Sequence, residues 1–138
     1  MDLPWQVVIA SSDVEGRRAL ANMLERFGVE PFLASTVREC KEILAMNRVG
    51  LIFCSRTLAD GDCYDLLNAS RAGRPKPMVV VTSSVSDWDE FLESMRLGAF
   101  DVIASPCRST DVEWMILQAL RYDRIHALPV AAAKSAVV

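Results

Sequence analysis

Short apolar runs alternate with segments of helical periodicity along this chain. The apolar runs cover residues 6–10, 31–34, 50–54, 78–82 and 101–104. Continuous apolar runs of four or five residues, each followed by small polar or turn-forming residues, predict strands buried on both faces. Helical spacing of apolar residues, with capping and breaker residues at the ends, predicts helices over 14–27, 36–47, 63–72, 88–98 and 110–124.

Five strand-to-helix repeats indicate the fold class. Parallel strands need a crossover helix between them, and helices on both sheet faces explain why the strands are apolar throughout. The sequence therefore predicts an α/β fold over residues 5–124: a doubly wound five-stranded parallel sheet in a three-layer sandwich. Residues 125–138 are small, apolar and without pattern, so we expect a C-terminal tail or a linker stump there.

Two of the predicted helices carry clear apolar stripes. Helix 88–98 carries Trp88, Phe91, Leu92 and Met95 on one stripe. Helix 110–124 carries a stripe expected to face the sheet, formed by Val112, Met115, Ile116 and Ala119. That phase turns Trp114, Leu117 and Arg121 outward. Thr36 with Glu39, and Thr110 with Glu113, have the spacing of capping boxes.

Composition and charge exclude several classes of function. The chain has 138 residues, is 51% hydrophobic and 24% charged, and carries a net charge of −3, which fits a globular domain without a basic field for nucleic acid or membrane. The N-terminal residues lack the features of a signal peptide, and no apolar run approaches the length of a membrane helix. We therefore expect a cytoplasmic protein. The four cysteines show no CxxC spacing, so neither zinc nor disulfides are predicted.

Hydroxyl residues follow the predicted strands at the ends where ligands gather in such sheets. They are Ser11 and Ser12 after strand 6–10, Ser55 after 50–54, Thr82 at the end of 78–82, and Ser105 after 101–104. These five residues form the candidate site.

The same segments resemble the receiver domain of bacterial two-component response regulators. The matching stretches are LADGD at 58–62, VVVTS at 79–83, GAF at 98–100 and IASPC at 103–107. The resemblance covers residues 5–124 and implies a flavodoxin-like, CheY-like fold acting in a phosphorelay. It also implies that Ser105–Pro106 is a cis peptide bond.

The resemblance also shows what the candidate site lacks. In that family an aspartate accepts a phosphoryl group, an acid pair helps to hold magnesium, and a lysine and a hydroxyl residue contact the phosphoryl group. Here the acid pair falls on Ser11 and Ser12, the acceptor on Ser55 and the lysine on Ser105, while Thr82 keeps the hydroxyl. Neutral hydroxyls cannot offset the dehydration of magnesium. We therefore expect a pseudo-receiver with no metal, no cofactor and no enzymatic activity. The family's switching aromatic falls on Val102.

Two other functions remain as alternatives on the same fold. A nucleotide or flavin module would need a phosphate loop after strand 6–10, where the chain offers serines and one late glycine. A serine or cysteine hydrolase would need a general base, and the sole histidine, His126, is expected in the tail beyond helix 110–124. Cys63 and Cys107 could support redox chemistry near the site.

The acids near the candidate site have structural interpretations. Asp13 is expected to serve as the N-cap or a first-turn acid of helix 14–27, with a role as a lone metal ligand as the alternative. Asp60 and Asp62 are expected to act as turn and cap residues.

A partner surface is predicted on helix 110–124. Trp114, Leu117 and Arg121 are the residue types that anchor interfaces, and receivers often dimerise or dock partners through the corresponding face. We expect a protein partner or a homodimer to use the face formed by helix 88–98, strand 101–104 and helix 110–124.

Overall fold

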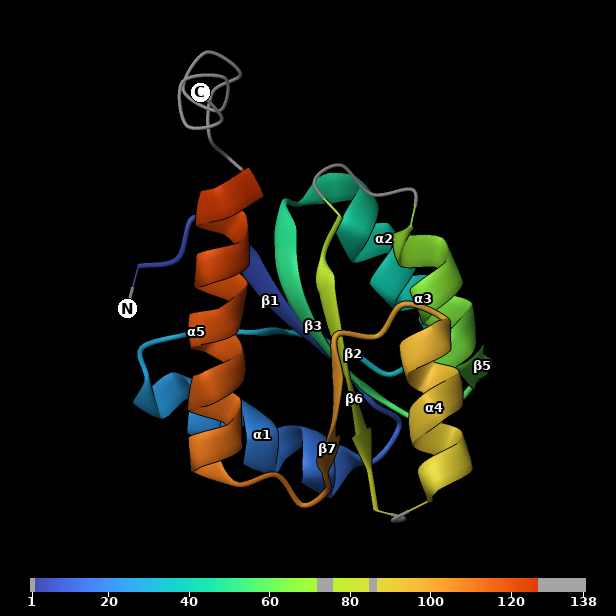
Figure 1. The fold of residues 1–138 in the computed structure, drawn as a ribbon. Coiled ribbons are helices and arrows are strands. Elements are labelled where there is room, and N and C mark those ends of the chain that lie inside the picture. The colour runs from blue at the N-terminus through green and yellow to red at the C-terminus, as the bar shows by residue number, and fades with distance from the viewer. Residues whose placement is uncertain (1, 72–75, 85–86, 127–138) are drawn as a thin grey trace.

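The computed structural model describes residues 2–71, 76–84 and 87–126. In this part of the chain five parallel strands form one sheet in the order β2-β1-β3-β6-β7 (Figure 1). The strands are β1 (Gln6–Ala10), β2 (Phe32–Ala34), β3 (Val49–Ser55), β6 (Met78–Ser83) and β7 (Asp101–Ala104). The helices are α1 (Val14–Arg26), α2 (Val37–Met46), α3 (Cys63–Ser70), α4 (Trp88–Arg96) and α5 (Ser109–His126). The predicted doubly wound parallel sheet is confirmed.

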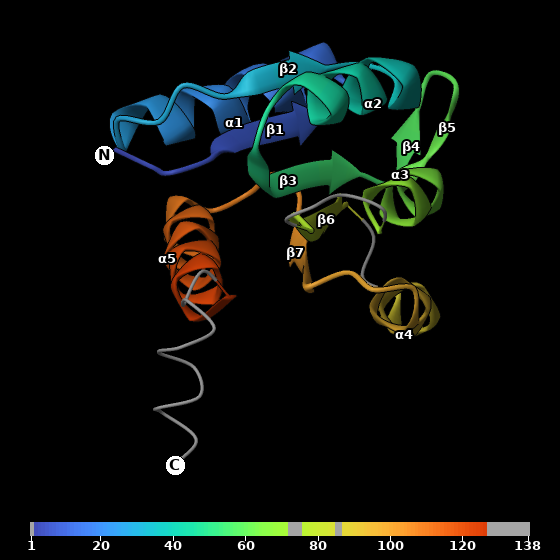
Figure 2. The same ribbon diagram turned by 90° about the horizontal axis from the view of Figure 1, so that it is seen from above.

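Each strand buries alternate side chains on opposite faces of the sheet, as a pleated strand must. In β1, Val7 and Ile9 belong to the core under α1 and α5. Val8 and Ala10 belong to the core under α2 and α3. Figure 2 shows the resulting layers, with α1 and α5 on one face and α2, α3 and α4 on the other. The order of the strands reverses direction between β1 and β3, so the carboxyl ends of these two strands flank the crevice where ligands bind in such folds.

Local signals explain several helix ends. Thr36 caps α2 as predicted, because its side-chain oxygen accepts a hydrogen bond from the Glu39 amide. Gly28 follows α1 with a φ of 75°, a left-handed conformation that glycine adopts without strain. The prediction that Thr110 caps the last helix is wrong, because α5 begins at Ser109 and Thr110 lies inside its first turn.

The loop predicted after β3 contains a small antiparallel hairpin, β4 (Thr57–Leu58) and β5 (Gly61–Asp62). Asp62 caps α3 through its side chain in a complete capping box. Asp60 instead caps α2, because its carboxylate accepts hydrogen bonds from the Val37 amide at 2.6 Å and the Arg38 amide at 3.1 Å. Both acids are therefore cap residues, and Asp60 fastens the hairpin to a helix 23 residues away in sequence.

The apolar stripe of helix α4 lies largely on its outer side. Trp88 is 69% exposed, Leu92 47% and Met95 37%. The buried residues of α4 are Glu90 and Ser94. Glu90 can be buried because Arg56, which follows β3, forms an ion pair with it. The inner side of α4 therefore carries a paired carboxylate and a serine, and most of its apolar stripe faces the solvent.

Helix α5 has the predicted phase. Val112, Met115, Ile116 and Ala119 are buried, and these four form the contact with the sheet. Trp114 and Leu117 are exposed at 56% and 46%, and Arg121 is exposed beside them. The predicted tail began at residue 125, but α5 runs to His126, and residues 127–138 lie outside the described residues.

Candidate functional site

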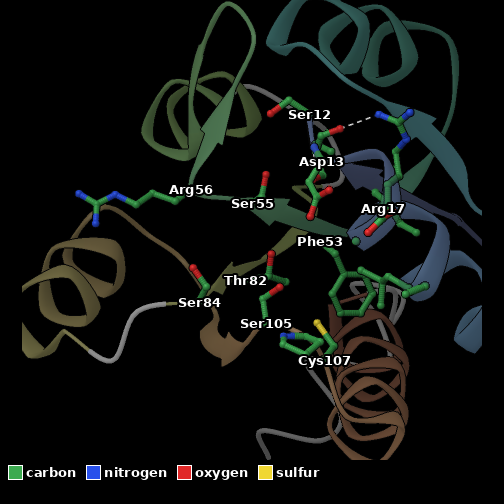
Figure 3. A pocket seen from close by; sticks show the side chains of 18 of the residues that line it. Ser12, Asp13, Arg17, Phe53, Ser55, Arg56, Thr82, Ser84, Ser105 and Cys107 are labelled. Carbon is green, nitrogen blue, oxygen red and sulfur yellow. Dashed lines mark hydrogen bonds between the residues drawn. The ribbon is translucent and has the colours of Figure 1, made fainter.

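A cavity of about 560 Å³ opens at the carboxyl end of the sheet (Figure 3). All five candidate residues line it, so the structure brings together Ser11, Ser12, Ser55, Thr82 and Ser105 from four strand ends. The other residues that line it are Ile9, Ala10, Asp13, Glu15, Gly16, Arg17, Ala19, Leu20, Met23, Phe53, Arg56, Thr57, Ser84, Pro106 and Cys107.

The loop after β1 is fixed by hydrogen bonds of Ser11. Its Oγ accepts from the Asp13 amide at 3.1 Å, and its carbonyl oxygen accepts from the Arg17 guanidinium at 2.7 Å. Ser12 is exposed, and its Oγ donates to the Thr57 carbonyl at 3.4 Å. The two serines, which the resemblance places at the family's acid pair, therefore form hydrogen bonds with the backbone of their own loop and of the neighbouring hairpin.

Asp13 is the N-cap residue of α1 by position, as expected, but its side chain makes no capping hydrogen bond. Its carboxylate lies against Gly16, where an added Cβ would come within 2.8 Å of Oδ2. The Asp13 carboxylate therefore does not cap the helix, and it lines the cavity instead.

Ser55 and Thr82 lie side by side at the ends of paired strands. They are register partners in the β3–β6 ladder. Ser55 Oγ donates to the Thr57 carbonyl at 3.0 Å. Thr82 is only 9% exposed, and no partner for its hydroxyl occurs among the described residues. Figure 3 shows the Thr82 hydroxyl pointing toward the space beneath Ser55.

Ser105, which follows β7, completes the hydroxyl corner, the part of the cavity lined by Ser11, Ser12, Ser55, Thr82 and Ser105. Its amide donates to the Ser83 carbonyl at 2.8 Å, which continues the strand pairing past the end of β7. The Ser105–Pro106 peptide bond is cis, as the resemblance implied. The Ser105 side chain has no hydrogen-bond partner among the described residues, so a neutral hydroxyl lies where the resemblance implies a lysine.

The corner is poorly equipped for metal or nucleophilic chemistry. Within residues 2–71, 76–84 and 87–126, no three His, Cys, Asp or Glu residues gather closely enough to hold a metal ion. The Ser55 hydroxyl is engaged with a carbonyl oxygen rather than with a general base, which an activated serine requires. The side chain of His126 lies outside the part of the chain whose side chains are described.

The cysteines near the site are held in their protonated form. Burial, together with the smaller effect of the nearby Asp111 carboxylate, raises the pKa of the Cys107 thiol to about 11. Burial also raises the pKa of Cys63 to about 11. A thiol with a raised pKa is a poor nucleophile at neutral pH, because the thiolate is the reactive form. This disfavours the redox and cysteine-hydrolase alternatives.

The nucleotide alternative finds no glycine-rich loop in the structure. The late glycine after β1, Gly16, lies within the first turn of α1 rather than in the loop that precedes it. The loop itself consists of two serines and an aspartate, and the carboxylate would repel a phosphate group approaching the helix N-terminus.

The structure adds a groove to the face that the sequence analysis predicted as a partner surface. A shallow groove of about 430 Å³ lies between the start of α4 and β7, and its lining includes Trp88, Phe91 and Val102. The rings of Trp88 and Phe91 stack with centroids 5.3 Å apart. The apolar stripe of α4 was visible in the sequence, but the pattern alone could not show that it faces outward.

Comparisons with known proteins agree with the resemblance. No protein-family model matches the chain. The chain is 24% identical to the response regulator PilR of Pseudomonas aeruginosa over 116 residues, which cover 84% of this chain and 26% of PilR. It is 26% identical to the photosynthetic apparatus regulatory protein RegA of Rhodovulum sulfidophilum over 111 residues, which cover 80% of this chain and 61% of RegA. The chain thus spans between about a quarter and three fifths of these relatives.

Solved structures show the same fold. A CheY-like response regulator receiver domain protein from Methanospirillum hungatei superposes with a TM-score of 0.78 at 20% identity, covering 88% of this chain and 98% of that one. The beryllofluoride-activated NtrC4 receiver domain dimer gives a TM-score of 0.78 at 20% identity, covering 85% and 97%. The chain therefore has the CheY-like receiver fold, and its sequence resembles response regulators. None of the described helices is long and apolar enough to cross a membrane.

Proposed function

We propose that this chain, a domain with the receiver fold of response regulators, is a pseudo-receiver that acts by binding protein rather than by accepting phosphate. The observation that carries the proposal is the chemistry of the corner. Ser11, Ser12, Ser55 and Ser105 line one cavity at the positions where the resemblance places three acids and a lysine. The fold is retained while the charged groups of the reaction are absent.

The physical consequence concerns charge on a transferring phosphoryl group. That charge is stabilised by a metal ion and by cationic side chains, and there is little other chemistry for the protein to supply. The hydroxyls of Ser11, Ser12 and Ser55 are neutral, so they do not supply the carboxylate oxygens by which proteins hold magnesium beside a phosphate group. These properties support a domain without enzymatic activity.

A surface remains that could carry the function. Large apolar side chains are exposed on α4 and α5, which flank β7 on one side of the molecule (Figure 2). They are Trp88, Leu92 and Met95 on α4, and Trp114, Leu117 and Tyr122 on α5. Interfaces are enriched in aromatic and arginine side chains, and Arg121 adds the arginine. The NtrC4 receiver is described as a dimer, which supports a second copy or another protein as the partner here.

The experiment is sedimentation of the chain and of its Trp114→Ala, Arg121→Ala and Trp88→Ala variants over a concentration series. Truncating an interface anchor costs about 2 kcal/mol, roughly thirtyfold in affinity. We expect weaker self-association, or weaker capture of a partner in a pull-down, with an almost unchanged Tm. Met46→Ala is the matched control, because Met46 is 83% exposed on α2, away from this face. Equal association of all four variants would reject the face.

A further inference from the structure

The cavity at the carboxyl end of the sheet extends well beyond the hydroxyl corner. Its lining runs along α1 from Asp13 to Met23, a rise of about 15 Å for ten helical residues. At the far end the lining is apolar, from Leu20, Met23, Phe53 and Cys107. Figure 3 shows Phe53 and Cys107 together on the side of the cavity away from Ser12. The cavity thus has a polar end and an apolar end, and its volume lies within the range of about 300–1,000 Å³ typical of small-molecule sites.

The charges that line the cavity are not balanced. Of its two cations, Arg56 is paired with the buried Glu90, whereas Arg17 donates to the neutral Ser11 carbonyl and keeps its charge. Figure 3 shows the Arg56 side chain directed away from the cavity. The carboxylates of Asp13 and Glu15 make no hydrogen bond or ion pair with any described residue. The polar end therefore carries two carboxylates against the charge of Arg17, so a negative charge remains for a ligand.

The position of the Asp13 carboxylate depends on Ser11 and Gly16 and not on a capping hydrogen bond. The Ser11 hydroxyl holds the Asp13 amide, and the missing side chain of Gly16 leaves the space that the carboxylate occupies. Thr82, more than nine-tenths buried, presents a hydroxyl without a partner among the described residues into the same cavity. This hydroxyl is not among the buried atoms that lack a partner, so it is accessible from the cavity and can form a hydrogen bond with a ligand there.

We infer that this cavity binds an amphipathic organic cation, a primary ammonium group joined to an apolar body. The ammonium group donates three hydrogen bonds, to Asp13 and to neighbouring hydroxyl oxygens, and the apolar body lies against Met23 and Cys107, which are only partly buried. Magnesium is a poorer fit, because hydroxyls do not replace its hydration shell. Anionic ligands are repelled by Asp13 and Glu15. This inference goes beyond the docking function proposed above and does not depend on it.

The test is an NMR titration of the full chain with three probes that share one apolar body: phenethylamine, 2-phenylethanol and phenylacetate. We expect the amine to bind most tightly and to shift the amides of residues 11–17, Thr82 and Cys107. Phenylacetate should bind most weakly. Equal affinity of the amine and the alcohol, tighter binding of phenylacetate, shifts confined to other residues, or no saturable shift with any probe would each overturn the inference.

Two variants test the role of the carboxylate. Asp13→Asn should weaken amine binding about tenfold or more, since hydrogen bonds to charged groups are the stronger ones, and should leave 2-phenylethanol unaffected. Gly16→Ala should displace the same carboxylate without removing it, because the new Cβ would meet Oδ2 at 2.8 Å, so it should weaken amine binding while raising Tm through better helix propensity. Glu25→Gln, which removes an exposed acid at the other end of α1, is the control. Unchanged amine affinity in Asp13→Asn would contradict the inference.

Discussion

Removing Arg56 should destabilise the protein more than removing its partner Glu90. The Glu90 side chain is 3% exposed, whereas the Arg56 side chain is 48% exposed. Arg56→Met therefore leaves a buried carboxylate without a counter-ion, while Glu90→Met leaves a guanidinium that water can solvate. The two substitutions delete the same ion pair, yet their consequences for the free energy of unfolding differ.

The magnitude follows from burial. Breaking a buried pair costs about 3–5 kcal/mol when the remaining charge is fully enclosed. Because water reaches the Arg56 side of this pair, we expect about 2–3 kcal/mol for Arg56→Met, or a Tm lowered by about 8 °C. Glu90→Met should cost about 1 kcal/mol or less, since it also removes Oε1, which has no partner among the described residues. The double variant should resemble Glu90→Met and be more stable than Arg56→Met alone.

Urea unfolding followed by tryptophan fluorescence and circular dichroism measures these differences. A change below 0.5 kcal/mol for Arg56→Met, on the order of an ordinary surface substitution, would refute the reasoning. A double variant less stable than both single variants would refute it too. Either result would mean that the buried side of α4 is not held by this ion pair.

Three further predictions concern positions away from the cavity. Ser94→Ala should stabilise the protein by about 0.5–1 kcal/mol in thermal unfolding, because Ser94 Oγ is buried without a partner and alanine favours a helix; a loss of stability would reveal a hydrogen bond there. Gly50→Ala should cost about 2–3 kcal/mol and shift tryptophan emission, since the added Cβ would lie 2.2 Å from the Trp5 ring; an unchanged Tm would contradict that packing. Hydrogen bonds from the Val37 and Arg38 amides lower the pKa of Asp60, so its stabilising effect is present above the unfolded pKa and lost as pH falls through the folded one. The difference in Tm between the wild type and Asp60→Asn should therefore shrink below about pH 4, and a difference independent of pH would argue against this cap.

The sequence carried enough information for the sheet, the strand ends and the phase of α5. Continuous apolar runs define the buried strands, and the carboxyl ends of parallel strands meet at one edge, so Ser11, Ser55, Thr82 and Ser105 could be placed together without a structure. On α5 the stripe is unambiguous, because the residues on its opposite side include Glu113, Trp114 and Arg121, of which two are charged.

Other features depend on contacts between distant segments. The orientation of α4 could not be predicted, because an apolar stripe shows that a helix has two faces but not which of them meets the sheet. Here Arg56 makes a buried Glu90 tolerable across 34 positions of sequence. The capping of α2 by Asp60 also depends on a contact between distant segments. The residues next to Asp60 in sequence indicate a turn there, but they do not indicate a contact with α2. The length of the cavity along α1 depends on how α1, β3 and the 105–107 segment pack.

The measurement that tests the central claim most directly is phosphorylation by a small donor. The chain is incubated with acetyl phosphate and Mg²⁺, and its intact mass is measured alongside a variant carrying Ser11→Asp, Ser12→Asp, Ser55→Asp and Ser105→Lys. We expect the mass of the natural chain to stay unchanged, and the same for Ser55→Asp alone, because the metal, the acceptor and the cation act as a unit. A stoichiometric gain of one phosphoryl group by the natural chain would contradict the account.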